Sequence, residues 1–226
     1  MRDDNGGRGV AVTLYELLMR VPGFDRFLPT WNDRLFARQF KKGLARFNDV
    51  LEQTELAGRY WVFSGMLLGW AREGDLLPRD RDADFGILPD DVPRLMRAVP
   101  KLVEAGFLPH KQFRTNDGKL VELMFLRRRA VYDFSIFFPR DGELQYFMFG
   151  WPPDQLVEVE KRLPVQNLVR FAFLGRTWLR HEDYVRELEL NYGDWRTPHR
   201  GWNYLTDGPN MVSSKPWVNT DTSWRD

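Results

Sequence analysis

The sequence predicts an α+β domain in which a small mixed sheet is flanked by helices. Three observations lead to this prediction: helical spacing of apolar residues before residue 56, a strand–turn–helix–strand order from residue 60 to 88, and two further strand-length apolar runs after residue 118. Helices alternate with strands in the first half, and strands then follow one another, which is the order expected when helices cover a sheet of mixed pairing.

The first predicted elements are helices. A short helix is expected over Val12–Val21, before a Pro-Gly pair that stops it. From Trp31 to about Leu56, apolar residues recur every three or four positions, which is typical of one amphipathic helix. Thr30 or Asn32 is expected to cap its N-terminus, because a side-chain oxygen at that position accepts a hydrogen bond from a free amide of the first turn.

The middle of the chain alternates between strand and helix. "YWVFSG" (Tyr60–Gly65) reads as a short strand that ends in a turn, "MLLGWARE" as a helix and "ADFGIL" as the next strand. "DDVPRLMRAVPKLVEAG" predicts a helix with a proline irregularity, capped by Asp90 or Asp91 and ended by Gly106. "KLVELMFLR" and "AVYDFSIFF" then predict two strands joined by a basic turn.

Later elements are less regular. "RFAFLGRTWL" predicts a hairpin around Gly175, and "HEDYVRELELNYG" predicts a helix closed by Gly193. Residues 194–226 show no clear period, although they contain several of the nine tryptophans. A polar segment rich in indoles is expected either to pack back onto the domain or to line a site.

Composition excludes several classes of protein. The 226 residues contain 33 Lys and Arg against 32 Asp and Glu, which argues against a protein whose main task is to coat nucleic acid. The absence of cysteine excludes disulfides, thiolate metal sites and a cysteine nucleophile, and it fits a reducing compartment. With neither a signal peptide nor an apolar run of about 18 residues, the expected location is the cytoplasm or a membrane periphery.

Two carboxylates stand where the polar run after residue 71 turns into an apolar strand. Asp82 and Asp84 lie two positions apart, so they point to the same face if the segment is extended. Burying two like charges is costly, and a divalent cation such as Mg²⁺ or Mn²⁺ would relieve the repulsion. The alternative is that this Asp-x-Asp pair belongs to a solvated surface turn.

A third acid, Asp133, lies in the apolar run "VYDFSIFF". If its strand neighbours the first one, all three carboxylates converge at one edge of the sheet, which is the layout expected for two-metal phosphoryl chemistry. Alternatively, Asp133 pairs with an arginine of the run 127–129.

These residues carry a family resemblance. "SGMLLGWAREGDLLPRDRDADFGI" resembles the signature of the LicD and fukutin group, and "LVELMF", "DFSIFF" and "LELNYGDWRTPHRGWNY" match in order after it, over roughly Tyr60–Trp217. The pattern is most similar to fukutin. The resemblance implies a nucleotidyltransferase fold like that of DNA polymerase beta. The expected organisation of the chain is a flexible N-terminus (1–11), N-terminal helices (12–58), a catalytic nucleotidyltransferase-like core (59–140) and a C-terminal helix and aromatic-rich segment packed on the core (141–226).

The resemblance also implies an activity. Members of this group move a phospho-alcohol, of the ribitol phosphate, glycerol phosphate or phosphocholine type, from a CDP-linked donor to a hydroxyl of a glycan or a similar acceptor, and CMP leaves. By position, Asp82 and Asp84 would hold the Mg²⁺ or Mn²⁺ ions, and Asp133 would be the third ligand, placed to bind the metal that activates the acceptor hydroxyl. The expected role is therefore modification of a cell-surface glycan or its precursor.

Residues for substrate binding are predicted with less guidance. Gly65, in a turn that opens a helix, offers amide groups to a diphosphate, although it could equally serve only to form the turn. One departure from the family is Met66, which stands where a small hydroxyl residue is expected; Ser64 is a candidate replacement. Gly69 is expected to serve close packing. The full set of candidates is Ser64, Gly65, Arg72, Arg79, Arg81, Trp195 and Lys215.

Two other functions remain open from the sequence. A nucleotidyltransferase that adds NMP to a small molecule or protein would share the fold and the acids but release pyrophosphate. A non-catalytic module that binds glycan or nucleotide would explain the aromatic tail but leave the three acids without a role.

Overall fold

A computed structural model describes residues 24–78, 80–150, 155–199 and 201–225, with the side chains of 24–32 excepted. Its contacts divide the chain into two compact units, Met1–Gln39 and Phe40–Asp226, and each is considered by itself. The described part of the first unit is the opening of helix α2 (Phe24–Leu51). The helix predicted over Val12–Val21 lies outside the described residues.

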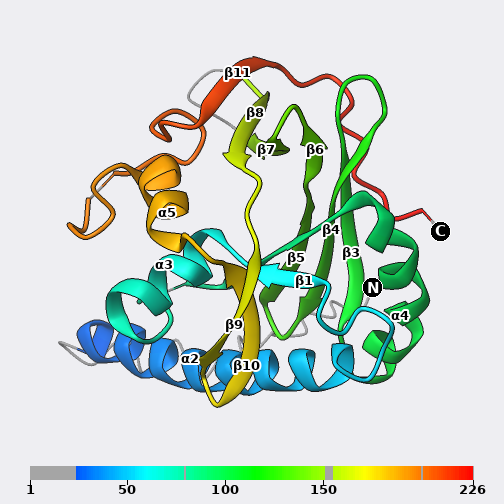
Figure 1. The fold of residues 1–226 in the computed structure, drawn as a ribbon. Helices are drawn as coiled ribbons and strands as arrows, with labels where there is room; N and C mark the ends of the chain where they lie inside the picture. The colour runs from blue at the N-terminus through cyan, green and yellow to red at the C-terminus, as the bar shows by residue number, and fades with distance from the viewer. Residues whose placement is uncertain (1–23, 79, 151–154, 200, 226) are drawn as a thin grey trace, which may run out of the picture. The chain divides into compact units, whose positions relative to one another are not determined.

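The second unit is built on a five-stranded sheet (Figure 1). Only the central pair, β2 with β5, is parallel, and the other neighbours are antiparallel. The mixed sheet predicted from the sequence is therefore confirmed. In spatial order its strands are β1 (Tyr60–Val62), β2 (Asp82–Ile87), β5 (Ala130–Ile136), β4 (Leu120–Arg127) and β3 (Leu108–Arg114).

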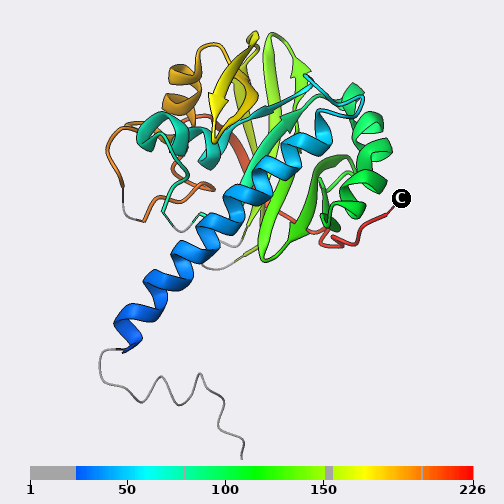
Figure 2. The ribbon, with the colours of Figure 1, turned by 90° about the horizontal axis from the view of Figure 1, so that it is seen from below.

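Side-chain alternation gives this sheet one apolar face and one polar face. On the apolar face, the Phe47 ring of α2 lies 5.3 Å from that of Phe85 in β2 and 4.9 Å from that of Tyr132 in β5. Residues 40–51 of α2 cross this face, as Figure 2 shows. The intervening residues of β2, β4 and β5 point to the opposite face, and several of them are acidic.

Helix α2 differs from its prediction at both ends. It begins at Phe24, so Thr30 and Asn32 lie inside the helix and do not cap it. It ends at Leu51, five residues early, because the Thr54 hydroxyl donates a 2.7 Å hydrogen bond to the Leu51 carbonyl and accepts one from the Leu56 amide. These local side-chain bonds replace the helical ones.

The remaining helices match the sequence closely. Helix α3 (Ser64–Glu73) follows β1 after one residue, and α4 (Val92–Glu104) follows a single 3₁₀ turn at Pro89–Asp91. Asp91 occupies the N-cap position of α4 but makes no side-chain cap bond; it pairs instead with Arg94, 2.9 Å away. In Figure 1, α3 and α5 (Tyr184–Tyr192) lie side by side, and α4 lies beside β3.

A second sheet follows the first. Its four strands were not predicted. The hairpin predicted around Gly175 is confirmed: β9 (Leu168–Phe173) and β10 (Arg176–His181) pair with each other as a separate two-stranded sheet. All four strands pair antiparallel, and β11 returns from the C-terminal segment to the edge. In spatial order they are β11 (Met211–Pro216), β8 (Val157–Pro164), β7 (Glu143–Gly150) and β6 (Phe138–Arg140).

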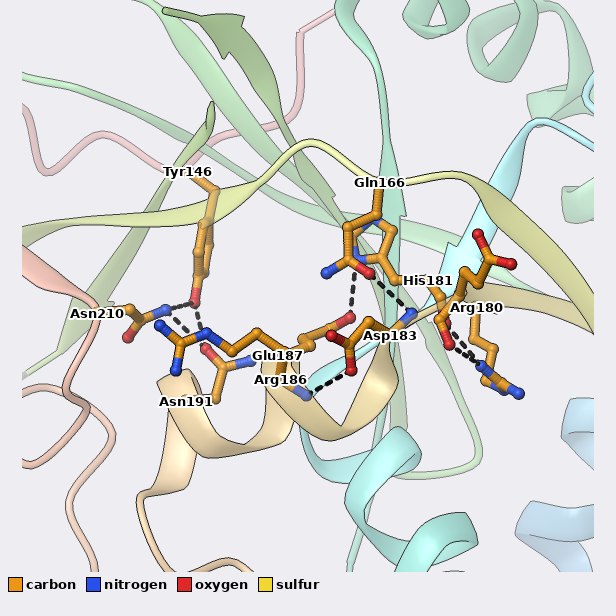
Figure 3. Close-up of polar contacts among 10 residues, drawn as sticks. Tyr146, Gln166, Arg180, His181, Asp183, Arg186, Glu187, Asn191 and Asn210 are labelled. Atoms are coloured by element: carbon orange, nitrogen blue, oxygen red, sulfur yellow. Dashed lines mark hydrogen bonds and ion pairs between the residues drawn. The ribbon is translucent and has the colours of Figure 1, made fainter. Parts of the chain in front are cut away.

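Buried polar contacts attach α5 to β7 of the second sheet and to β10 of the hairpin (Figure 3). The Asn191 side-chain oxygen accepts hydrogen bonds from the Tyr146 hydroxyl of β7, at 2.7 Å, and from the Asn210 amide, at 2.8 Å. One turn earlier, Glu187 and His181 of β10 form a fully buried pair with 2.7 Å between oxygen and nitrogen. These bonds fix the end of α5, which carries Tyr192 towards the acidic face of the first sheet.

No helix within the described ranges is both long enough and apolar enough to cross a membrane.

Candidate active site

The three predicted acids come together on the polar face of the first sheet. Asp84 of β2 and Asp133 of β5 are directly opposite each other in the parallel register, and Asp82 points to the same face two residues before Asp84. Alternation along β5 explains why a carboxylate is tolerated within "VYDFSIFF": Asp133 points to the face that carries the acids of the neighbouring β2, while Tyr132 and Phe134 remain in the core. The pairing of Asp133 with an arginine is not found among the described residues.

The N-terminus of helix α3 contacts this acidic face. The Gly65 amide donates a 3.0 Å hydrogen bond to Asp84 Oδ2, so the amide that the sequence offered to a diphosphate is occupied by a protein carboxylate. The turn itself depends on Ser64, whose φ of 52° lies in the left-handed region. Gly65 instead provides room, because a Cβ there would stand 3.3 Å from Asp84 Oδ2 and 3.4 Å from Asp80 Oδ2.

A cavity of about 330 Å³ lies over these acids. Five carboxylates line it: the three predicted ones, Asp80 and Glu122. Ser64 and Gly65 form part of its wall, and the Ser64 hydroxyl lies 3.2 Å from the Tyr192 hydroxyl. The other lining residues are mostly apolar or aromatic: Phe113, Met124, Met148, Phe149, Tyr192, Trp202 and Tyr204.

Mutual repulsion and burial both favour protonation of these carboxyl groups. Burial, followed by the charges of Asp80 and Asp82, raises the pKa of Asp84 well above its usual value, while hydrogen bonds from the Gly65 and Met66 amides lower it. Burial and then Asp84 raise the pKa of Asp133 in the same direction. Burial is also the main reason why the pKa of Asp80 rises to about 6 and that of Glu122 to about 8.

The donor set at this face fits a hard divalent cation. It consists of carboxylate oxygens, which Mg²⁺ and Mn²⁺ prefer, and a positive ion would remove the repulsion that raises these pKa values. Asp80 Oδ2 is buried without a hydrogen-bond partner and is thus available. As the side chains stand, no three acids or histidines among the described residues are grouped to hold a metal ion, so three of these side chains could share one ion only if some of them rotated.

Two predicted substrate-binding residues lie in an adjacent cavity. Arg72 and Trp195 line a space of about 240 Å³ that shares Tyr192 and Trp202 with the acidic cavity. The Arg72 guanidinium is mostly buried and donates a 2.9 Å hydrogen bond to Glu73. Trp195 is buried with its indole N–H unpartnered. Both residues thus face a hollow next to the acids and not the acids themselves.

The remaining predicted cations have other positions. Lys215 lies on β11 and forms a 3.0 Å ion pair with the buried Glu158, so the structure does not bring it to the acidic cavity. Arg81 is exposed, and its charge lowers the pKa of Asp82 against the larger effect of burial, so it partly screens the charge of that carboxylate. Arg79 lies outside the described residues.

Sequence reasoning missed two of the five acids, although signals for both were present. Asp80 continues the alternation of Asp82 and Asp84, two residues earlier, and it reaches the same cavity. Glu122 interrupts the apolar run "KLVELMFLR", as Asp133 interrupts the next strand. An acid within an apolar run of strand length was the argument applied to Asp133, and it applies equally to Glu122.

A protein-family comparison agrees with the fold and the site. Residues 58–178 match the family described as "LicD/FKTN/FKRP, nucleotidyltransferase domain". The matched segment covers more than half of the chain and includes all five acids. This protein therefore belongs to the LicD/FKTN/FKRP family, and its α+β core is a nucleotidyltransferase-like domain.

Curated relatives carry the name of one activity. "Ribitol 5-phosphate transferase FKRP" of Mus musculus is 33% identical over 152 residues, which is 64% of this chain and 30% of that protein. "Ribitol-5-phosphate transferase FKTN" of Mus musculus is 27% identical over 176 residues, which is 72% of this chain and 35% of that protein. The chain thus spans about a third of the length of these relatives.

Proposed function

We propose that this protein transfers a phospho-alcohol group from a CDP-activated donor to a hydroxyl of a glycan or similar acceptor and releases CMP. Two observations support the proposal: family membership, with relatives named ribitol phosphate transferases, and a cavity lined by clustered carboxylates. The observation that carries it is the juxtaposition of Asp84 and Asp133 on parallel strands, with Asp82 on the same face. Burying acids without counter-charges costs folding free energy, so a cluster of them indicates a site that binds a ligand.

Asp82, Asp84 and Asp133 would hold divalent cations, either Mg²⁺ or Mn²⁺. When bound, such ions stabilise the negative charge on the phosphoryl group and on the entering and leaving oxygens. Asp84 is oriented for this role by the Gly65 amide, and Asp133 by the rigid strand pairing. Asp133 is the least exposed of the three, and by its position in the family pattern it would bind the metal that activates the acceptor hydroxyl.

Binding of the donor is assigned to the neighbouring hollow. Arg72 is a cation in the wall of that hollow, so it suits a phosphate of the CDP group. Trp202 and Tyr192, which line both cavities, offer flat rings to a nucleoside or to the transferred alcohol. Ser64 is held by Tyr192 and faces the acids, where it can donate a hydrogen bond to a phosphoryl oxygen.

The test is a donor panel. The protein is incubated with Mn²⁺, a mixture of methyl glycosides as acceptors, and CDP-ribitol, CDP-glycerol, CDP-choline or CTP, and CMP and pyrophosphate are measured. The proposal expects CMP from at least one CDP-alcohol and its loss in Asp82→Asn. Pyrophosphate release from CTP would indicate a nucleotidyltransferase instead, and turnover unaffected by Asp82→Asn would contradict any catalytic role of the acids.

A further inference from the structure

One wall of the acidic cavity combines two aromatic rings with an unpartnered carboxylate. Phe113 of β3 is the cross-strand partner of Glu122 of β4, so both side chains leave the sheet next to each other. Phe149 of β7 completes this wall, and its ring lies 5.3 Å from that of Phe113 at an angle of 24°. We propose that Phe113, Phe149 and Glu122 bind a sugar ring of the acceptor. This inference rests on the proposed function and specifies where its acceptor binds.

The two rings form a supported platform. Trp217, from the segment after β11, is buried and contacts both rings: it stacks on Phe113, with centroids 5.6 Å apart, and lies tilted by 47° against Phe149, with centroids 4.6 Å apart. Its indole N–H donates a 2.9 Å hydrogen bond to the Arg114 carbonyl, which fixes the indole behind the rings. Phe113 and Phe149 are only half-buried and line the cavity. A flat apolar surface of this kind suits the C–H face of a sugar ring.

Glu122 supplies the polar part of the site. Its side chain is only 9% exposed, it lines the cavity, and no described residue donates a hydrogen bond to it. Burying a carboxylate without a hydrogen-bond donor costs free energy. A ligand that supplies donors to it therefore binds more tightly. Sugar hydroxyls are such donors, and adjacent ones can bind both oxygens of one carboxylate.

The wall formed by Phe113, Phe149 and Glu122 is assigned to the acceptor and not to the nucleotide because it does not line the hollow that contains Arg72. The hollow lined by Arg72 joins the acidic cavity at Tyr192 and Trp202, whereas Phe113, Phe149 and Glu122 line the acidic cavity alone. In an in-line displacement the attacking and leaving groups stand on opposite sides of the phosphorus. If the CMP group leaves towards Arg72, the acceptor approaches from the Phe113 wall.

The experiment uses methyl glycosides of common hexoses and N-acetylhexosamines as acceptor probes. Binding of the glycosides to the full chain without donor is followed by saturation-transfer NMR. In a second experiment, CMP release with Mn²⁺ and CDP-ribitol is measured against glycoside concentration, which gives the half-saturating concentration. Phe113→Leu keeps an apolar side chain but removes the flat ring, and it is expected to abolish saturation of the ring C–H protons. Glu122→Gln is expected to raise the half-saturating glycoside concentration by about tenfold. Glu160→Gln, on β8, is the matched control.

Several outcomes would overturn this inference. They are the absence of any glycoside signal with the unmodified protein, unchanged glycoside binding in both variants, or weaker Mn²⁺ binding in Glu122→Gln, which would make Glu122 a metal ligand. Phe149→Leu replaces Phe113→Leu should that variant not fold. Failure of the proposed function is distinguished by CMP release: if no CDP-alcohol is cleaved while glycosides bind at this wall, the transferase proposal fails and the sugar site stands.

Discussion

Asp84 and Asp133 face each other across the only parallel strand pair of the five-stranded sheet. A parallel pair requires a crossover, and here the chain between β2 and β5 supplies α4, β3 and β4 before it returns. Two acids separated by almost fifty residues are thus held by backbone hydrogen bonds on both sides. The repulsion between the two carboxylates cannot be relieved by separating the strands, so it destabilises the folded protein.

Asp133→Asn is expected to make the metal-free protein more stable and the enzyme inactive. The substitution replaces an acid whose ionisation is opposed by burial and by Asp84 with a neutral side chain, so the free energy of unfolding at neutral pH should rise by about 1 kcal/mol, while CMP release should fall at least about a hundredfold. Thermal unfolding in EDTA and the CMP assay measure the two effects. The control is Asp141→Asn, on an exposed turn whose φ of 53° asparagine also tolerates. A destabilised Asp133→Asn variant would contradict this account.

The stability of the metal-free protein should fall as pH rises from about 4 to about 8. The folded-state pKa of Asp80 is raised to about 6 and that of Glu122 to about 8, so the folded protein retains protons that the unfolded chain releases. When the folded state binds more protons, stability decreases with pH. Unfolding in urea at several pH values measures this slope, which Asp80→Asn should reduce. A flat profile over this range would count against the acidic cluster.

Added Mn²⁺ should reverse that pH trend. Metal binding requires deprotonated carboxylates, so its affinity increases as pH rises through the raised pKa values, and binding to the folded state adds stability. The melting temperature with Mn²⁺ minus that with EDTA is therefore expected to be larger at pH 8 than at pH 5.5. Asp84→Asn should remove most of the difference, whereas an equal shift in this variant would place the metal elsewhere.

Much of the first sheet was predictable because its strands obey simple rules. The runs that became β2, β4 and β5 are apolar, of strand length and bounded by turns, and the acids in them follow from alternation. Asp82, Asp84 and Asp133 were therefore found from residues alone. What sequence could not give was which strands are neighbours, because register depends on tertiary packing. Glu122 was missed although it interrupts a predicted apolar strand in the same way as Asp133, and only the strand order shows that the two acids reach one cavity.

The second sheet was not predicted, and two of its strands, β8 and β11, lack the apolar pattern that indicates a strand in the sequence. β8 reads "VEVEKRLP", in which charged residues stand at nearly every second position, and β11 reads "MVSSKP", which is exposed throughout. The aromatic residues beside them pack on one another through ring contacts that carry no sequence period. The role of Trp217 as a support for Phe113 and Phe149 is therefore visible only in the structure.

Gly69→Ala is expected to destabilise the protein by about 1 to 3 kcal/mol, as overpacking of a close contact does. A Cβ at this position of α3 would lie 2.6 Å from the Asp75 carbonyl oxygen and 2.9 Å from the Leu77 amide, and neither backbone atom can move freely. The same loop leads to Asp80, so Mn²⁺ affinity should fall as well. The contact supports the packing role predicted for Gly69. Unchanged unfolding in this variant would disprove that role.

Asn191→Leu should weaken the attachment of α5 and, through it, the wall of the active site. The substitution leaves the Tyr146 hydroxyl without its acceptor and removes one partner of the Asn210 amide in a buried space, at a cost of about 2 to 4 kcal/mol. Tyr192 follows directly in sequence and contacts Ser64, so donor binding should weaken too. Asn167→Leu, at an exposed hydrogen bond, is the matched control and should change stability by less than about 0.5 kcal/mol. Denaturant unfolding and titration with CMP measure both effects, and equal losses in the two variants would show that the buried contacts carry no special weight.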